Sequence, residues 1–188
     1  MSDSGFYTGR GDRGDTSRLK GAERISKSSA LVEAVGTLDE ATSAIGLARS
    51  LTQSNALTEA LTLVQRHIYR LASHLSAVPE ARKEYPGLSQ GDVDWLEGVI
   101  AELEADLPAL KGFVLPGEST SGAACHLART VVRRAERRLV TLAELEPPIG
   151  DANLAYINRL SSLMFVAALS EDLMSSQRLN PAREQAES

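Results

Sequence analysis

The stretch FVLPGESTSGAACHLARTVVRRAERRLVTL, residues 113–142, decides the fold of this chain. It opens with the turn residues Pro116 and Gly117 and then predicts one long helix. The helical period divides the positions after the turn into a polar and an apolar face. The polar face carries His126, Arg129, Arg133, Glu136 and Val140, and the apolar face carries Ala124, Leu127, Val131, Ala135 and Leu142. The apolar face predicts that this helix packs against other helices.

Five arginines crowd this helix, in a chain whose formal net charge is −5: Arg129, Arg133, Arg134, Arg137 and Arg138. A basic stripe on an acidic protein indicates a small anionic ligand and argues against binding of nucleic acid. Arg138 falls on the apolar side, so we expect it to be buried beside a partner. The spacing alone leaves open the alternative that the arginine face is simply solvated.

The composition is that of a globular protein with one domain. The 188 residues are 43% hydrophobic and 24% charged, and the chain is long enough to bury a substantial core. The single cysteine, Cys125, excludes an intrachain disulfide and is expected to be a packing residue in a reducing cytosol. No apolar run has the length of a membrane span, and the first residues lack a secretory or transit signal. We therefore expect a cytoplasmic protein that binds neither membrane nor nucleic acid.

Residues 1–29 form a segment rich in glycine, serine and arginine. Glycines let backbone N–H groups converge on an anion, and the basic side chains add charge. Residues 9–16 nearly match the phosphate-loop pattern, but Asp15 takes the place of its lysine, so this is a different motif. Two Arg-Gly-Asp triplets would suggest adhesion only in a secreted protein. Composition leaves open that this leader is disordered.

Four further helices are expected around the central one, over residues 30–51, 55–77, 89–107 and 153–176. The second carries a heptad seam of aliphatic residues, which is typical of bundle packing, with His67 and His74 beside it as partly buried polar residues. The third begins at the capping residue Ser89, with Asp92 at its third helical position. The pattern predicts an all-α, up-down bundle of five helices, four of them forming the core.

The last predicted helix is apolar almost all round, which indicates that it is buried on several sides. Polar residues in such a helix need partners, so Asn158 and Arg159 are expected to be paired and Asn158 is a site candidate. The chain is thus divided into a leader at 1–29, a helical bundle domain at 30–177 and a flexible tail at 178–188.

Four separated motifs resemble, in order, those of the PduO-type ATP:cob(I)alamin adenosyltransferases. The first is YTGRGDRGDT at 7–16, and the second is EAVGTLDEATSAIG at 33–46. The third combines FVLPG at 113–117 with HLARTVVRRAERR at 126–138, and the fourth is NRLS at 158–161. The resemblance covers nearly the whole chain. Gly9, Arg10, Ser28, Ser29 and Ser162 depart from the family pattern, the last of them standing where the family usually has aspartate.

The resemblance implies a homotrimer whose active site lies between subunits and transfers the 5′-deoxyadenosyl group of ATP to cob(I)alamin, releasing triphosphate. Mg²⁺ is expected to accompany the ATP. The residues expected to bind ATP are Thr8, Gly9, Arg10, Gly11, Thr16, Ser17, Lys27, Arg133, Arg134 and Arg137, with Glu136 and Asn158 holding the nucleoside. Arg129 would pair with Asp39 of the partner subunit. Phe113 would occupy the lower face of the corrin and exclude its axial base. A cobalamin-dependent enzyme or a reductase is a possible further partner.

Three alternatives compete with this interpretation. The first is a non-catalytic carrier of cobalamin or nucleotide on the same scaffold, which the departures at Gly9, Arg10 and Ser162 favour. The second is a ferritin-like di-metal bundle, but none of the three histidines follows a glutamate at the required spacing. The third, a purely structural trimeric bundle, explains the heptad seam but leaves Asn158 and the glycine-arginine leader without a role.

Overall fold

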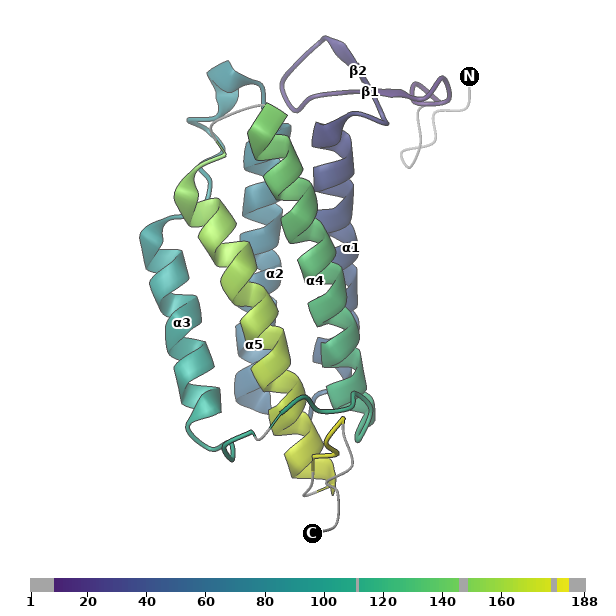
Figure 1. Ribbon diagram of the computed structural model, residues 1–188. Coiled ribbons are helices and arrows are strands. Elements are labelled where there is room, and N and C mark those ends of the chain that lie inside the picture. The colour runs from purple at the N-terminus through teal and green to yellow at the C-terminus, as the bar shows by residue number, and fades with distance from the viewer. Residues whose placement is uncertain (1–8, 111, 146–148, 177–178, 183–188) are drawn as a thin grey trace.

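The computed structural model describes residues 9–110, 112–145, 149–176 and 179–182, and within them the chain forms an up-down helical bundle (Figure 1). The helices are α1 (Ala30–Leu51), α2 (Asn55–Ser76), α3 (Gln90–Glu104), α4 (Thr120–Leu145) and α5 (Asp151–Ser176). Helices α1, α2, α4 and α5 form the core, and α3 packs on the outside of α5. The predicted bundle of five helices with a four-helix core is confirmed. None of the described helices has the length and apolar character that a membrane span requires.

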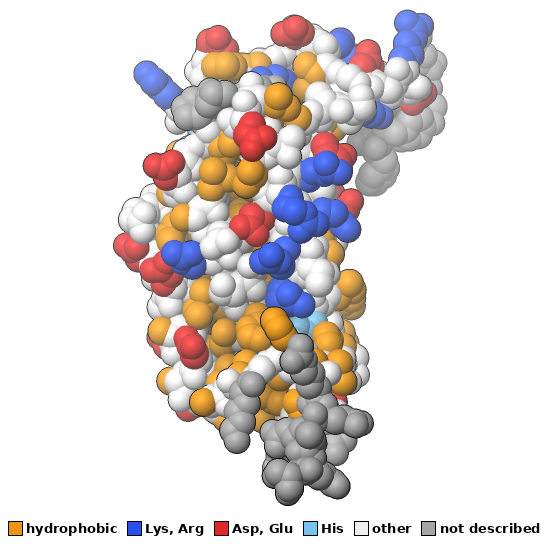
Figure 2. All heavy atoms as spheres, in the orientation of Figure 1, with side chains coloured by type: hydrophobic (Ala, Val, Ile, Leu, Met, Phe, Trp, Pro, Cys, Tyr) orange, Lys and Arg blue, Asp and Glu red, His pale blue; other side chains and the backbone are white. Residues whose placement is uncertain are grey.

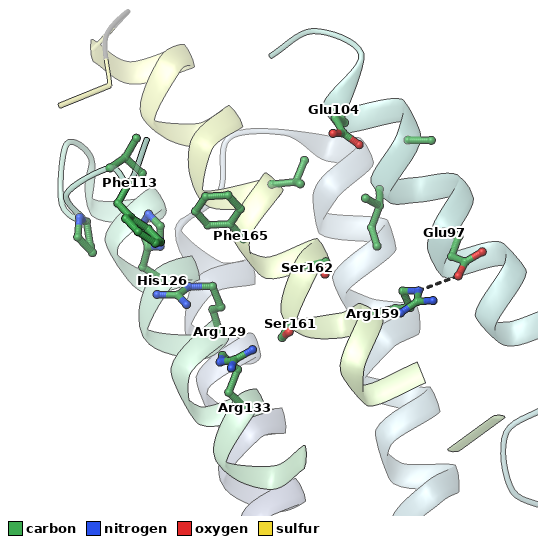
Figure 3. Close-up of a pocket in the computed structure, with 15 residues that line it drawn as sticks. Glu97, Glu104, Phe113, His126, Arg129, Arg133, Arg159, Ser161, Ser162 and Phe165 are labelled. Atoms are coloured by element: carbon green, nitrogen blue, oxygen red, sulfur yellow. Dashed lines mark hydrogen bonds and ion pairs between the residues drawn. The ribbon is translucent and has the colours of Figure 1, made fainter. Parts of the chain in front are cut away.

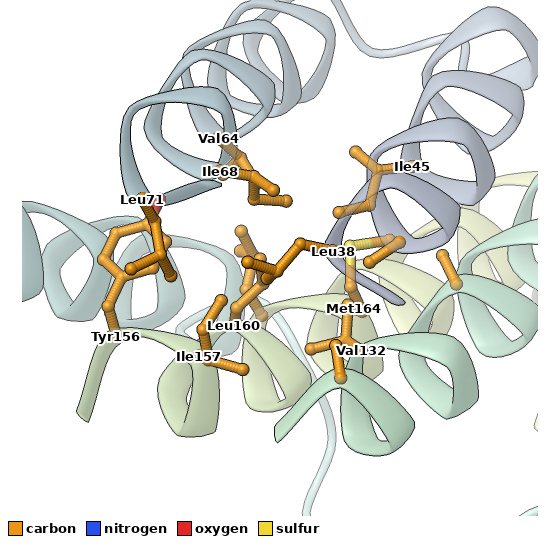
Figure 4. Packing of buried hydrophobic residues seen from close by; sticks show 14 of the residues in the cluster. Leu38, Ile45, Val64, Ile68, Leu71, Val132, Tyr156, Ile157, Leu160 and Met164 are labelled. Carbon is orange, nitrogen blue, oxygen red and sulfur yellow. The ribbon is translucent and has the colours of Figure 1, made fainter. Parts of the chain in front are cut away.

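Small residues bring α1 and α4 close together. Helix α1 buries Ala34, Ala41 and Ala48 at seven-residue intervals, which keeps one row of short side chains on a single face. Helix α4 likewise buries Ala124, Ala128 and Ala135. Because alanine has little bulk, the two backbones approach closely over the length of the pair, and the larger side chains Leu38 and Ile45 fill the space toward α2 and α5 (Figure 4).

The heptad seam predicted for α2 is confirmed, because every residue of the seam is at most 2% exposed: Leu57, Leu61, Val64, Ile68, Leu71 and Leu75. The seam packs toward α5, where Tyr156, Ile157, Leu160 and Met164 close the core (Figure 4). Burial of this aliphatic surface is the main source of stability, at about 25 cal/mol per Å² of apolar surface removed from water.

A polar network ties α2, α3 and α5 together inside this core. The Nδ1 atom of His67 lies 2.9 Å from the hydroxyl of Tyr156, and its Nε2 lies 3.4 Å from Asp92. Asp92 also forms a capping box with Ser89, the predicted capping residue, and pairs with Arg70. Burial by itself raises the pKa of Asp92, but the bonds from Arg70 and Ser89 outweigh it and hold that pKa below its usual value. His67 is therefore a structural residue, as expected.

The leader is ordered over residues 9–29, so the disordered alternative is wrong for this part of it. Strands β1 (Asp15–Ser17) and β2 (Arg24–Ser26) form an antiparallel hairpin that the sequence did not predict. Leu19 then bonds to the end of α2, donating to the carbonyl of Ser76 at 2.8 Å. The guanidinium of Arg18 donates to the carbonyl of Ala77 at 2.9 Å. These bonds fix the hairpin at one end of the bundle (Figure 1).

At the opposite end, residues 179–182 pair with the loop that carries Phe113. The amide of Leu115 donates to the carbonyl of Asn180 at 2.8 Å, and the amide of Ala182 donates to the carbonyl of Phe113 at 2.7 Å. This pairing was not predicted for the segment expected to be a flexible tail. Residues 183–188 lie outside the described part, so the prediction for them is untested.

Candidate functional site

An open cavity of about 710 Å³ lies between α3, α4, α5 and the loop before α4 (Figure 3). Helix α3 supplies Glu97, Ile100 and Glu104, the loop supplies Phe113, Val114 and Pro116, α4 supplies His126, Arg129 and Arg133, and α5 supplies Arg159, Ser161, Ser162, Phe165 and Val166. One end of the cavity is aromatic and aliphatic, and the other is cationic. Such a cavity suits a large ligand with an apolar face and an anionic partner.

The apolar end is built from aromatic side chains around one buried histidine. The ring of His126 lies 5.9 Å from that of Phe165, and the guanidinium carbon of Arg129 lies 6.0 Å from the Phe165 ring centre. Phe113 is 88% exposed, which is unusual for a phenylalanine and indicates a surface that a ligand or another chain covers. Burial, and after it the charge of Arg129, lower the pKa of His126, so its ring is neutral at pH 7.

His126 and Arg129 both have polar atoms that point into this region without a partner. Neither ring nitrogen of His126, which is 4% exposed, has a hydrogen-bond partner among the described residues. The same holds for the Nε of Arg129. Because a buried polar atom without a partner is costly, these atoms are candidates for contact with a ligand or a neighbouring subunit. Asp39 is exposed on α1 and does not contact Arg129 within the described chain, so their expected pairing between subunits stays a prediction.

The buried histidines make stability depend on pH. Burial lowers the pKa of both His67 and His126, so in the unfolded state these rings bind protons at a higher pH than in the folded state. We expect the free energy of unfolding to fall as pH is lowered from 7 to 5, by at most about 1.4 kcal/mol per pH unit for each histidine. Urea unfolding of the wild type and of the His126→Gln variant at several pH values tests this. The variant should fall less steeply, and equal slopes would contradict the assignment.

Of the five arginines of α4, Arg129 lies over Phe165 and lines the cavity without an ion pair among the described residues. The other four divide into two without a carboxylate partner in that part of the chain and two that are paired. The guanidinium of Arg133 reaches the cavity and has no hydrogen bond or ion pair among the described residues, and Arg137 donates to the carbonyl of Arg133 at 3.0 Å. Arg134 pairs instead with Glu40 of α1, and Arg138 pairs with Glu33 at 3.1 Å. Basic side chains form a continuous row on the surface over α4 (Figure 2). Of these four, only Arg133 lines the cavity.

The prediction that Arg138 is buried is wrong, because its side chain is 49% exposed. The apolar face of α4 is centred on Ala128, Val132 and Leu139, whereas Leu127 is 53% exposed. The sequence-based assignment gave too little weight to alanine, which has little hydrophobic surface but lets helices approach closely. Arg138 therefore lies at the edge of the packed face and extends its guanidinium toward α1 and water.

Asn158 has the partner that the sequence predicted for it, although its side chain is exposed rather than buried. Its Nδ2 donates to the Oε1 of Glu136 at 2.7 Å. Its Oδ1 accepts from Arg159 at 2.9 Å, and Arg159 in turn donates to Glu97 at 2.8 Å. The structure thus joins two predicted site residues, Asn158 and Glu136. Sequence reasoning missed Glu97, because its position in α3 has no local signal that distinguishes it from a solvated glutamate.

Three of the predicted leader residues, Gly9, Arg10 and Ser17, line a second cavity of about 780 Å³, whereas Gly11, Thr16 and Lys27 are not part of its lining. Two bonds brace its loop: Lys27 donates from Nζ to the carbonyl of Gly11 at 2.9 Å, and Arg24 donates to the carbonyl of Arg10 at 2.7 Å. Gly9 and Gly14 have φ of 67° and 78°, in the left-handed region that favours glycine. Thr16 lies in β1, and Thr8 lies outside the described residues.

The two cavities have no lining residue in common. The leader hairpin lies at one end of the bundle and the loop that carries Phe113 lies at the other (Figure 1). Within one chain, the leader therefore does not meet the Phe113 loop. No group of three acidic, histidine or cysteine side chains in the described ranges is placed to hold a metal ion. Cys125 is buried, and burial raises the pKa of its thiol to about 12, which agrees with its prediction as a packing residue.

The fold and the site define a class of protein: a helical bundle with an aromatic cavity beside arginines that have no carboxylate partner among the described residues. Residues 6–171 match the family described as cobalamin adenosyltransferase. The chain therefore belongs to the cobalamin adenosyltransferase family, whose members are transferases, and the predicted resemblance to its PduO-type members is confirmed.

Individual relatives agree with this assignment. The chain is 41% identical over 167 residues to the corrinoid adenosyltransferase of Bacillus subtilis, an alignment that covers 87% of this chain and 84% of the relative. It is 39% identical over 170 residues to that of Mus musculus, covering 87% and 70%. A variant of the PduO-type ATP:corrinoid adenosyltransferase from Lactobacillus reuteri, solved in complex with cobalamin and ATP, superposes with a TM-score of 0.86 at 31% identity, covering 95% of this chain and 99% of that one.

Proposed function

We propose that this chain transfers the 5′-deoxyadenosyl group of ATP to the cobalt of cob(I)alamin. The observation that carries the proposal is the cavity in which an exposed aromatic, Phe113, and an unpaired cation, Arg133, lie at opposite ends of one wall. The family assignment supports it, as does the complex of the Lactobacillus reuteri relative with cobalamin and ATP. Adenosylcobalamin and triphosphate are the products.

In this reaction an electron pair of Co(I) forms the bond to C5′ while the C5′–O bond breaks, and triphosphate leaves with that bond's electrons. Negative charge collects on the triphosphate as the bond breaks. Fixed guanidinium groups stabilise this charge in the transition state, and we assign this role to Arg133 and Arg137. The metal centre is itself the nucleophile, so the reaction needs no general base. The protein supplies position and charge, and the corrinoid supplies the reactive atom.

The apolar end of the cavity is the proposed corrinoid surface. This part of the lining is apolar and offers a macrocycle surface to cover: Phe113, Val114, Phe165 and Val166. We propose that Phe113 lies against the lower face of the corrin and excludes its axial base, which makes Co(II) easier to reduce. The hydrogen bonds from residues 179–182 to the Phe113 loop support this placement, because they hold the backbone of an otherwise exposed residue.

We propose a homotrimer in which the leader of one subunit meets the arginine helix of the next. The separation of the two cavities within one chain supports this arrangement, as do the unpaired atoms of His126 and Arg129. Gly9, Arg10, Gly11, Thr16, Ser17 and Lys27 would then face Arg133 across the interface. Since the described residues offer no carboxylate cluster for Mg²⁺, we expect the ion to arrive bound to ATP.

An anaerobic assay with cob(I)alamin and ATP tests the proposal. We expect the absorbance of the Co(I) form to be replaced by that of an alkyl-cobalt product, with one triphosphate released per adenosylcobalamin. A carrier on the same scaffold would bind both compounds and release no triphosphate, and that result would refute the proposal. Ser162, which lines the cavity in place of the usual aspartate of the family, is one of the departures, with Gly9 and Arg10, that suggested a carrier. The relatives do not favour a carrier, because they are named as corrinoid adenosyltransferases. The cytoplasmic location remains a prediction, as does a partner enzyme or reductase.

A further inference from the structure

A chain of hydrogen bonds leads from α3 to the proposed nucleoside site on α4. Glu97 of α3 accepts from the Nε of Arg159 at 2.8 Å, and the Nη1 of Arg159 donates to the Oδ1 of Asn158 at 2.9 Å. The Nδ2 of Asn158 then donates to the Oε1 of Glu136 at 2.7 Å. In Figure 3 a dashed line joins Glu97 and Arg159, on the side of the cavity away from Phe113.

This series of hydrogen bonds favours one of the two orientations of the Asn158 amide. A carboxamide has nearly the same shape when its oxygen and nitrogen exchange places, so packing alone does not distinguish the two. Here a guanidinium faces the oxygen and a carboxylate faces the nitrogen. The exchanged orientation would set the amide N–H groups against Arg159 and the amide oxygen against Glu136, which replaces two charge-assisted bonds with two repulsions.

The position of the Arg159 side chain depends on Glu97, because buried residues do not enclose that side chain. The side chain of Arg159 is 45% exposed and that of Glu97 is 47% exposed. A long, half-exposed arginine loses considerable conformational freedom when it adopts one position. The bond to Glu97 keeps the guanidinium beside Asn158 in the free protein. Arg159 is therefore already ordered when a ligand binds, and binding loses no further conformational entropy of this side chain.

We infer that Glu97 is a positioning residue for the nucleoside: through Arg159 it orients Asn158 and Glu136 so that the second carboxylate oxygen of Glu136 can accept from a sugar hydroxyl. This inference rests on the proposed function and adds α3 to the nucleotide site. A purely structural role is a poor alternative, because an exposed ion pair contributes only about 0–1 kcal/mol to stability.

The first experiment compares Glu97→Gln with Glu102→Gln in the wild-type background. Glu102 is an exposed glutamate of the same helix that does not line this cavity. We expect Glu97→Gln to raise the KM for ATP about 3- to 10-fold and to leave the KM for cob(I)alamin within about twofold. Glu102→Gln should leave both KM values within about twofold. An equal rise in both variants would assign the effect to the negative charge of α3 in general and overturn the inference.

A double-mutant cycle then tests whether Glu97 acts through Asn158. Asn158→Ala should raise the KM for ATP, and adding Glu97→Gln to it should produce little further change, because the amide that Glu97 positions is absent. If the two effects multiply, or if Glu97→Gln raises the KM for the corrinoid instead, Glu97 does not position the nucleoside. The wild type is measured in the same assay. An inactive wild type would refute the proposed function. If the wild type is active but the effects of the two substitutions on the KM for ATP multiply, only this inference is refuted.

Discussion

Replacing Arg133 with alanine is expected to lower kcat for adenosyl transfer by about 10²–10³-fold. Arg129 and Arg133 of α4 both line the cavity without a carboxylate partner among the described residues, but the guanidinium of Arg129 lies over the Phe165 ring. Within the described part of the chain, Arg133 makes no ring contact of this kind. Its charge is therefore available to the triphosphate, and the interaction strengthens as negative charge develops on the leaving group. Because it acts mainly in the transition state, kcat should fall more than the KM for ATP rises. Steady-state kinetics with pre-reduced cobalamin measure both constants.

Arg138→Ala is the matched control for this prediction. Arg138 lies on the same helix and carries the same charge, but it pairs with Glu33 and does not line the cavity. The control variant should retain activity within about threefold, since an exposed ion pair contributes little. If the two variants lose equal activity, the general positive field of α4 matters rather than the position of Arg133. Undiminished turnover in Arg133→Ala would remove this arginine from the mechanism.

The Gly122→Ala variant is expected to lose at least about 3 kcal/mol of folding stability. A Cβ atom at position 122 would lie 2.0 Å from the Oδ1 of Asp172 and 2.8 Å from the Oγ of Ser119. Asp172 is 1% exposed and accepts from the amide of Ser119 at 2.9 Å and from its hydroxyl at 2.7 Å. The methyl group would separate α4 from α5 or displace this buried carboxylate from its donors.

Gly98→Ala controls for the change in helix propensity. Gly98 also lies inside a helix, but it is exposed and a Cβ there meets no atom within 4 Å. Alanine at this position should stabilise the protein by about 0.5–1 kcal/mol. Chemical denaturation of both variants measures the difference. A Gly122→Ala protein as stable as the wild type would show that α4 and α5 can move apart at this point without cost.

Local sequence patterns were sufficient for the helices. The capping box at Ser89 and the aliphatic seam of α2 depend on residues within one helix, so the sequence shows them directly. Helix α3 ends at Glu104 rather than near residue 107, because the amide of Leu107 donates to the carbonyl of Glu104 at 3.0 Å and so forms a turn in place of a further helical bond. The family could be identified because four motifs occur along this chain in the same order as in the PduO-type adenosyltransferases.

Contacts between distant segments could not be predicted in the same way. The leader hairpin depends on the end of α2, and the Phe113 loop depends on residues 179–182. Arg138 was placed wrongly because helical spacing shows which residues share a face but not where the neighbouring helix lies. Glu97 was missed because its role depends on Arg159, which lies 62 residues further along the chain.

The sequence by itself determined the helical class, the boundaries of most helices, the family and the arginine-rich character of the site. These follow from hydrophobic period, capping residues and motif order, which are properties of neighbouring residues. The tertiary structure alone decided which arginines of α4 are paired with carboxylates and which line the cavity without such a partner among the described residues. Packing α4 on α1 through alanines brings Glu33 and Glu40 to Arg138 and Arg134, and the burial of α4 against α5 turns Arg133 toward the cavity. Charge pairing between helices depends on their distance and rotation, which only the packed core defines.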